Sequence, residues 1–196
     1  MMKFWVTGAA VLCGLMPLEL MAGPISASGF GAGAVVEGYE SMHPGGNVSV
    51  PMVLNGHTYT SDGAQVSSHI NGGPKVGATG NALSTITDLA YIDVALASPA
   101  FRVGVFAGSD STPGLPKVEF FDSSDALLAT LFPGPSLFVG YETGGNAIAR
   151  IRITDTASDG LPVLLDNLTI EVPEPAVVGL LVAAACVNLS RSRRRH

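Results

Sequence analysis

The sequence predicts an all-β chain, an antiparallel β-sandwich that is jelly-roll-like, and three observations predict it. Short runs of β-branched and aromatic residues follow one another along the chain, and Gly-Gly pairs and prolines separate them. No uninterrupted stretch between the two chain ends shows convincing helical periodicity. The runs recur at short spacing, and many short strands of this kind favour two packed antiparallel sheets.

Nine strands are expected, and two of the runs form a readable hairpin. The runs 118–121 and 127–132 flank Asp122-Ser123-Ser124-Asp125, whose side chains can cap a tight turn. A later run alternates apolar residues with Arg150 and Arg152, as a strand with one wet face does. The expected strands cover residues 48–54, 65–70, 89–96, 101–106, 118–121, 127–132, 137–141, 148–154 and 164–170.

The N-terminus reads as a secretory signal peptide with a helical apolar region. Lys3 provides the positive charge, and an apolar run fills residues 4–16. The small residues that a leader peptidase needs lie between Ala22 and Ser28, so we expect the cut in this interval. Residues 1–27 are therefore assigned to the signal peptide and residues 28–172 to the exported domain.

The C-terminus, residues 173–196, combines three features in a fixed order. Pro173-Glu174-Pro175 forms a stiff extended strip, an apolar run fills residues 176–189, and a basic cluster follows. As a helix the run is about 21 Å long, against roughly 30 Å of hydrocarbon core, so it suits a transient stop better than a permanent anchor. The basic cluster consists of Arg191, Arg193, Arg194 and Arg195.

This tail resembles the PEP-CTERM sorting tail of bacterial surface proteins. The resemblance implies that an exosortase, a membrane-embedded cysteine transpeptidase-like enzyme, recognises the tail and processes the chain near Pro-Glu-Pro. It also implies a precursor anchored in the inner membrane through its tail, and then a protein at the cell surface or outside the cell. A plain short anchor with basic flanks is the alternative reading of the same residues.

Without its two ends the chain is strongly acidic. Residues 28–172 hold five cations and fourteen acids, a net charge of −9. Such a surface repels nucleic acid and anionic lipid and could attract divalent cations, so we expect no nucleic-acid partner. Cys13 and Cys186 both lie in the end segments, which excludes a disulfide or a Cys-ligated metal site from the exported domain.

A second resemblance covers roughly residues 91–170, mostly as a hydrophobic pattern. This region is similar to the jelly-roll domain of many PEP-CTERM proteins. These domains are similar in turn to carbohydrate-binding modules. In such modules an acid on the final strand often joins an early acid at a structural calcium ion. The resemblance implies that Asp166 would pair with Glu37 or Glu40 at such an ion, whose preferred ligands are oxygens.

Asp166 also invites attention on physical grounds. Strand alternation places it on one face with Leu164, Leu168 and Ile170, where a carboxylate is costly unless it is paired or binds a cation. Hydrogen bonding to the backbone, or to Arg150 or Arg152, is the alternative to calcium. The cofactor expectation is therefore limited to Ca²⁺ at this one residue.

Other motifs carry little chemistry. The segment 29–34 satisfies a G-x-G-x-x-A pattern without the strand and helix that a dinucleotide site needs, so we expect a flexible N-terminus there. His43, His57 and His69 lack metal-ligand spacing and are expected at exposed loops or edges. Trp5 is removed with the signal peptide. The tyrosines then remain as aromatic platforms on which a sugar could stack: Tyr39, Tyr59, Tyr91 and Tyr141.

The leading expectation is a non-enzymatic surface or extracellular-matrix protein. A carbohydrate-binding module for exopolysaccharide is the first alternative, and aromatic side chains gathered on one sheet face or loop end would favour it. A hydrolase on a jelly-roll scaffold is the second alternative, and it would need two carboxylates about 5–10 Å apart in a cleft. No nucleophile, metalloprotease or phosphate-loop motif is present.

Overall fold

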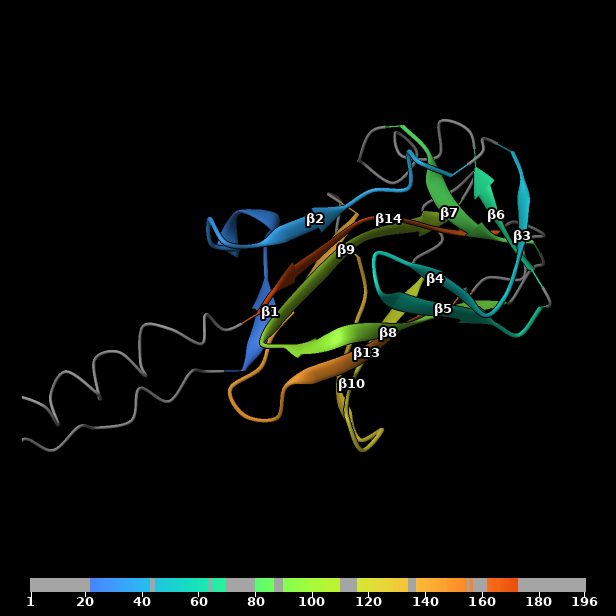
Figure 1. The fold of residues 1–196 in the computed structure, drawn as a ribbon. Coiled ribbons are helices and arrows are strands. Elements are labelled where there is room, and N and C mark those ends of the chain that lie inside the picture. The colour runs from blue at the N-terminus through green and yellow to red at the C-terminus, as the bar shows by residue number, and fades with distance from the viewer. Residues whose placement is uncertain are drawn as a thin grey trace, which may run out of the picture.

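The computed structural model is an antiparallel all-β protein made of two facing sheets (Figure 1). It describes residues 22–42, 45–63, 65–69, 80–86, 90–109, 116–133, 137–154, 156 and 162–172. The expected signal and membrane helices fall on residues outside these ranges. Among the described residues no helix is long and apolar enough to cross a membrane.

Fourteen strands and one 3-10 turn make up the described part of the chain. They are β1 (Gly23–Ile25), η1 (Ala27–Gly29), β2 (Val35–Glu37), β3 (Asn47–Ser49), β4 (Met52–Leu54), β5 (His57–Ser61), β6 (Gln65–His69), β7 (Ala82–Thr85), β8 (Tyr91–Ala100), β9 (Arg102–Ser109), β10 (Lys117–Asp122), β11 (Leu127–Leu131), β12 (Phe138–Glu142), β13 (Ile148–Thr154) and β14 (Val163–Glu171).

The strands form an eight-stranded and a six-stranded sheet. The eight-stranded sheet has the order β1-β12-β9-β14-β7-β6-β3, and β2 pairs with the C-terminal half of β14. The six-stranded sheet has the order β11-β10-β13-β8-β5-β4. Successive strands from β7 to β10, and again from β11 to β14, lie alternately in the two sheets. Each crossover therefore connects two strands that pack against the same core.

The core lies between the sheets and is filled by alternate residues of the long strands. Ile151 and Ile153 of β13 are buried while Arg150 and Arg152 between them stay partly exposed. This is the alternation expected for a strand with one wet face. Residues of the other sheet, Leu165 among them, complete the same apolar cluster.

Nine expected strand regions correspond to strands, and one of them needs correction. The run 48–54 is two strands, because β3 pairs with β6 in one sheet while β4 pairs with β5 in the other. Val50 and Pro51 make the transition, and Pro51 has no N–H to continue a ladder. The strands β1, β2, β5 and β7 were not expected.

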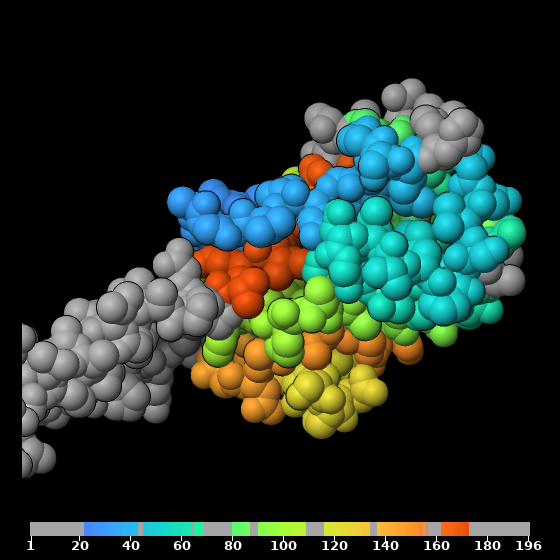
Figure 2. Space-filling model, viewed as in Figure 1, coloured from blue at the N-terminus to red at the C-terminus, as the bar shows by residue number. Residues whose placement is uncertain are grey.

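The N-terminal residues form a strap across the eight-stranded sheet; this name covers residues 23–37. β1 pairs with β12 at one edge of the sheet. β2 pairs with β14, which is separated from β12 by β9. Between them the ring of Phe30 packs edge-on against Phe138 at 6.0 Å, over Gly104. Figure 2 shows this N-terminal segment (blue) lying against the C-terminal strand (orange-red).

The strap corrects two expectations. The segment 29–34 is packed against the sheet rather than flexible, and the Gly31 N–H donates to Glu171 Oε2 at 2.8 Å. The folded domain also begins before Ser28, because Gly23–Ile25 already form a paired strand.

Candidate functional site

Asp166 lies in β14 and is fully buried. Its Oδ1 accepts a hydrogen bond from the Asn167 N–H at 2.7 Å, and its Oδ2 is buried without a hydrogen-bond partner among the described residues. Burial raises the pKa of Asp166 to about 6; the Asn167 N–H opposes this shift and the charge of Glu40 adds to it. Burial therefore disfavours the charged form of Asp166, as expected for a carboxylate on an apolar face.

The face expected for Asp166 needs correction. Asp166 lies opposite Phe106 and shares the outer face with Leu164, whereas Leu168 and Ile170 point into the core. The reason is a β-bulge: the register shifts between Asp166 and Thr169, and Asn167 has a φ of 47°. The extra residue reverses the alternation after Asp166, which a strict period of two cannot anticipate.

Glu37 ends β2 opposite Leu168 of β14, so it belongs to the eight-stranded sheet. Its Oε1 accepts a hydrogen bond from Nε2 of His57, which lies on β5 in the other sheet, at 3.1 Å. His57 Nδ1 in turn accepts the backbone N–H of Ala97 at 3.0 Å. Because Nδ1 accepts, Nε2 is the ring nitrogen that donates to Glu37. Glu37 Oε2 is buried without a hydrogen-bond partner among the described residues.

Two buried tyrosines lie beside these acids. The rings of Tyr39 and Tyr59 meet edge-on at 6.0 Å, and their hydroxyl oxygens are 3.4 Å apart. Burial raises the pKa of Tyr59 to about 12, and burial also raises the pKa of Tyr39 well above its ordinary value. The charges of Asp166 and Glu37 add to the shift of the Tyr39 pKa.

The three acids expected at a calcium ion are linked only through their charges: that of Glu40 adds to the raised pKa of Asp166, and those of Asp166 and Glu37 add to the raised pKa of Tyr39. Glu40 is exposed, and its Oε1 accepts the Asn81 N–H at 3.0 Å. Within the part of the chain that the structure describes, two buried carboxylate oxygens, one each from Glu37 and Asp166, lack a hydrogen-bond partner, which suits a cation. Within the described ranges, however, no three His, Cys, Asp or Glu side chains group closely enough to hold a metal. Calcium at Asp166 stays a prediction.

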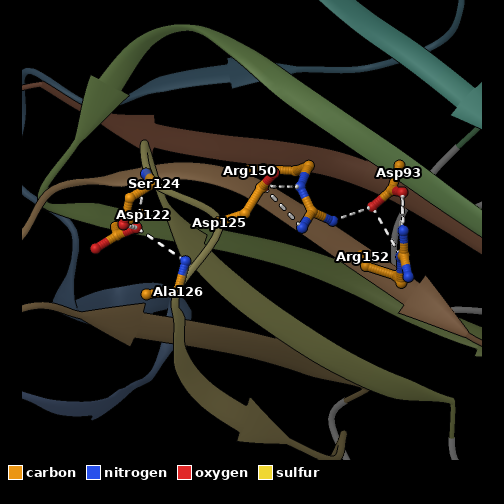
Figure 3. A network of polar contacts seen from close by, with 7 residues as sticks. All are labelled: Asp93, Asp122, Ser124, Asp125, Ala126, Arg150 and Arg152. Carbon is orange, nitrogen blue, oxygen red and sulfur yellow. Dashed lines mark hydrogen bonds and ion pairs between the residues drawn. The ribbon is translucent and has the colours of Figure 1, made fainter.

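A second group of polar side chains covers the outer face of the six-stranded sheet (Figure 3). Asp93 of β8 accepts from Arg150 Nη1 at 2.7 Å and from Arg152 Nε at 3.0 Å. The Arg150 guanidinium lies 3.8 Å from the centre of the Phe121 ring, and that of Arg152 lies 4.4 Å from Tyr91. We call these five residues the charged face. Its arginines bond to Asp93 and not to Asp166, which removes the expected alternative of an Arg–Asp166 pair.

The hairpin turn beside the charged face is held by one carboxylate. Asp122 Oδ1 accepts from the N–H of Ser124 at 2.8 Å and from that of Ala126 at 3.0 Å (Figure 3). Its Oδ2 accepts from Asn146 at 2.9 Å. The bonds from Ser124, followed by that from Ala126, lower the pKa of Asp122 to about 2. The predicted turn cap is confirmed, and its role is structural.

The remaining expected residues are distributed as follows. The sorting motif, Pro173 to Pro175 with Arg191 and Arg193 to Arg195, lies outside the described residues, as does His43. His57 was expected to be exposed and is buried instead. His69 is described by its backbone alone. Sequence reasoning missed the hydrogen bonds of His57, because no local motif signals a contact between two sheets.

Four residues at one end of the eight-stranded sheet form a row across four strands: Gly23, Glu142, Arg102 and Glu171. Arg102 donates to Glu142 Oε1 at 2.8 Å and to Glu171 at 3.3 Å, so one cation serves two carboxylates. The bond to Glu142, more than that to Glu171, raises the pKa of Arg102. We call this set the end row.

No protein-family model, curated protein or solved structure matches the chain.

Proposed function

We propose that this chain is a non-enzymatic bacterial surface or extracellular-matrix protein, exported through the inner membrane and sorted by an exosortase-type enzyme. In this proposal the N-terminal segment, cut between Ala22 and Ser28, directs export, and the apolar run 176–189 holds the precursor transiently in the membrane. The enzyme then acts near Pro173-Glu174-Pro175, and the β-sandwich is the part delivered to the surface.

The end row is the observation that carries this proposal. Gly23 and Glu171 are three strand spacings apart, about 14 Å, at one end of the sheet. The chain therefore enters and leaves the folded domain side by side. Both apolar end segments can reach one membrane without crossing the domain, as an export precursor held at both ends requires.

The strand order supports the jelly-roll assignment. The set β7-β14-β9-β12 faces the set β8-β13-β10-β11, and β7 to β10 and β11 to β14 alternate between the two. Eight strands wound in this way, with β10 and β11 as the one local hairpin among them, are the arrangement of a jelly roll. Such a scaffold presents wide sheet faces and no requirement for catalysis.

Intact mass measurement of the exported protein tests the sorting proposal. In a strain with a working exosortase the product should lack residues 176–196, and in a strain without the enzyme it should keep them. Glu174→Gln within the motif should block processing, whereas Val172→Ala, at an exposed position just before it, should not. An intact C-terminus in the competent strain would leave a plain anchor.

A carbohydrate-binding module for exopolysaccharide is the second candidate, and the charged face favours it. Tyr91 and Phe121 lie on one sheet face, each beneath an arginine, and planar groups of this kind can pack against sugar rings. A glycan array probed with the exported protein tests this. Tyr91→Ala and Phe121→Ala should abolish any signal, and Phe132→Ala, at an exposed position after β11, should preserve it.

A further inference from the structure

The start of the folded domain limits where an export leader can be removed. The small residues between Ala22 and Ser28 leave several peptide bonds open to a leader peptidase. The structure places β1 inside this interval, with Gly23, Pro24 and Ile25 opposite Glu142, Tyr141 and Gly140. A cut anywhere from Pro24 onward would shorten or delete this strand.

Loss of β1 would disturb the sheet in two ways. The edge of β12 would lose its paired neighbour. The side chain of Ile25 would also leave Gly140, against which it packs so closely that a Cβ there would lie 2.9 Å from Ile25 Cγ1. Ala22, by contrast, is exposed and precedes the first paired residue, so its loss removes no strand.

Charge points to the same bond. In the end row the carboxylates of Glu142 and Glu171 share the single guanidinium of Arg102, so the row carries one net negative charge. Gly23 lies directly opposite Glu142. A positive charge on the Gly23 nitrogen would bring the summed charge of the row to zero, and only a cut just before Gly23 creates one there.

We infer that the bond between Ala22 and Gly23 is the export processing site, and this inference rests on the proposed export. A leader peptidase that accepts small residues adds water across this bond. The C–N bond breaks and a C–O bond forms, so Ala22 leaves with the leader as a carboxylate. Gly23 keeps the nitrogen, which takes up the proton and becomes an ammonium group beside Glu142. Ala22 is a small residue and lies six positions after Met16, the end of the apolar run.

N-terminal sequencing of the exported product, made from the full-length chain, tests the inference. The product should begin Gly-Pro-Ile. A product that begins at any residue from Pro24 to Gly29 would overturn the inference while leaving export in place. A full-length chain that stays in the cytoplasm with Met1 or Met2 at its start would overturn the proposed export as well.

Two matched variants sharpen the test. Ala22→Leu places a bulky side chain at the bond and should reduce the mature product at least tenfold. Ala27→Leu makes the same change at an exposed residue of η1 and should leave both the yield and the Gly23 start unchanged. The reverse pattern, with Ala27→Leu blocking maturation and Ala22→Leu permitting it, would move the site downstream and overturn the inference.

Discussion

His57 and Glu37 form a hydrogen bond of 3.1 Å between the two sheets of the sandwich. The donor is on β5 and the acceptor on β2, and the other ring nitrogen of His57 holds the Ala97 N–H on β8. One imidazole therefore satisfies polar groups from both sheets.

The first prediction concerns this imidazole. His57→Phe should lower the free energy of unfolding by about 2–4 kcal/mol, because a buried carboxylate oxygen and a backbone N–H both lose their partners. Urea unfolding at pH 7 measures the change. Glu37→Gln is the matched control, since its amide oxygen can still accept from Nε2, and its loss should be smaller. Equal stability of the wild type and His57→Phe would contradict the bridge.

The second prediction concerns Asp166 and pH. Its pKa is about 6 in the folded chain, against roughly 3.9 for an unfolded aspartate. Between these values the folded state binds more protons than the unfolded state, so stability falls as pH rises from 4 to 6, by about 3 kcal/mol. Asp166→Asn should flatten this slope and be the more stable protein at pH 7. Urea titrations of both proteins at several pH values, with chelator present, measure this slope. The same slope in the wild type and in Asp166→Asn would contradict the prediction.

The third prediction concerns calcium at the same residue. If the ion binds, millimolar calcium should raise the melting temperature by several degrees, equivalent to about 2.7 kcal/mol at 100 times the dissociation constant. Asp166→Asn and Glu37→Gln should each reduce the shift, and magnesium serves as the ion control. Superimposable melting curves in calcium and in chelator would leave Asp166 as a protonated or hydrogen-bonded structural residue.

The fourth prediction concerns the hairpin turn. The pKa of Asp122 is about 2, so its stabilising effect is complete above pH 4 and disappears as pH falls through 2. Asp122→Ala should therefore melt at a lower temperature than the wild type at pH 5, and the difference should shrink toward pH 2. Ser124→Ala, which removes the Ser124 hydroxyl donor and keeps the backbone donors, should lose less. A constant difference across this range would show that the charge does not matter.

The fifth prediction concerns the strap. A Cβ at Gly104 would lie 2.4 Å from Phe138 Cζ and 2.9 Å from Phe30 Cζ, so Gly104→Ala should cost about 1–3 kcal/mol of stability. Gly145→Ala is the control, because nothing lies within 4 Å of its Cβ position. Denaturant midpoints compare the two, and equal midpoints would refute close packing of the strap.

The strand pattern was largely predictable, because side-chain alternation is a local property of the chain. Ile148–Thr154 shows it most clearly, with Arg150 and Arg152 between buried isoleucines. The strands that escaped prediction carry weak local signals. β5 is mostly polar and β1 is three residues long, so partners distant in sequence determine their conformation.

The burial of Asp166 was predictable, and its geometry was not. A lone acid in an apolar strand indicated Asp166, which is buried with one oxygen that has no partner among the described residues. The prediction of the sheet face on which Asp166 lies was wrong, because the β-bulge at Asn167 depends on pairing with β9. The bond from His57 to Glu37 joins residues on different sheets, and no period or motif within one segment can reveal it.

The strap has a consequence for the timing of folding. Gly23 pairs with a residue 119 positions later, and Glu37 pairs with one 131 positions later. Contacts of such long sequence separation form slowly, because the intervening chain must first be ordered. A chain that emerges from its N-terminus first cannot dock its own first strands until β12 and β14 have followed. In newly made protein the strap therefore stays undocked until the last strand of the sandwich has been synthesised, and β12 and the C-terminal half of β14 lack these neighbours until then.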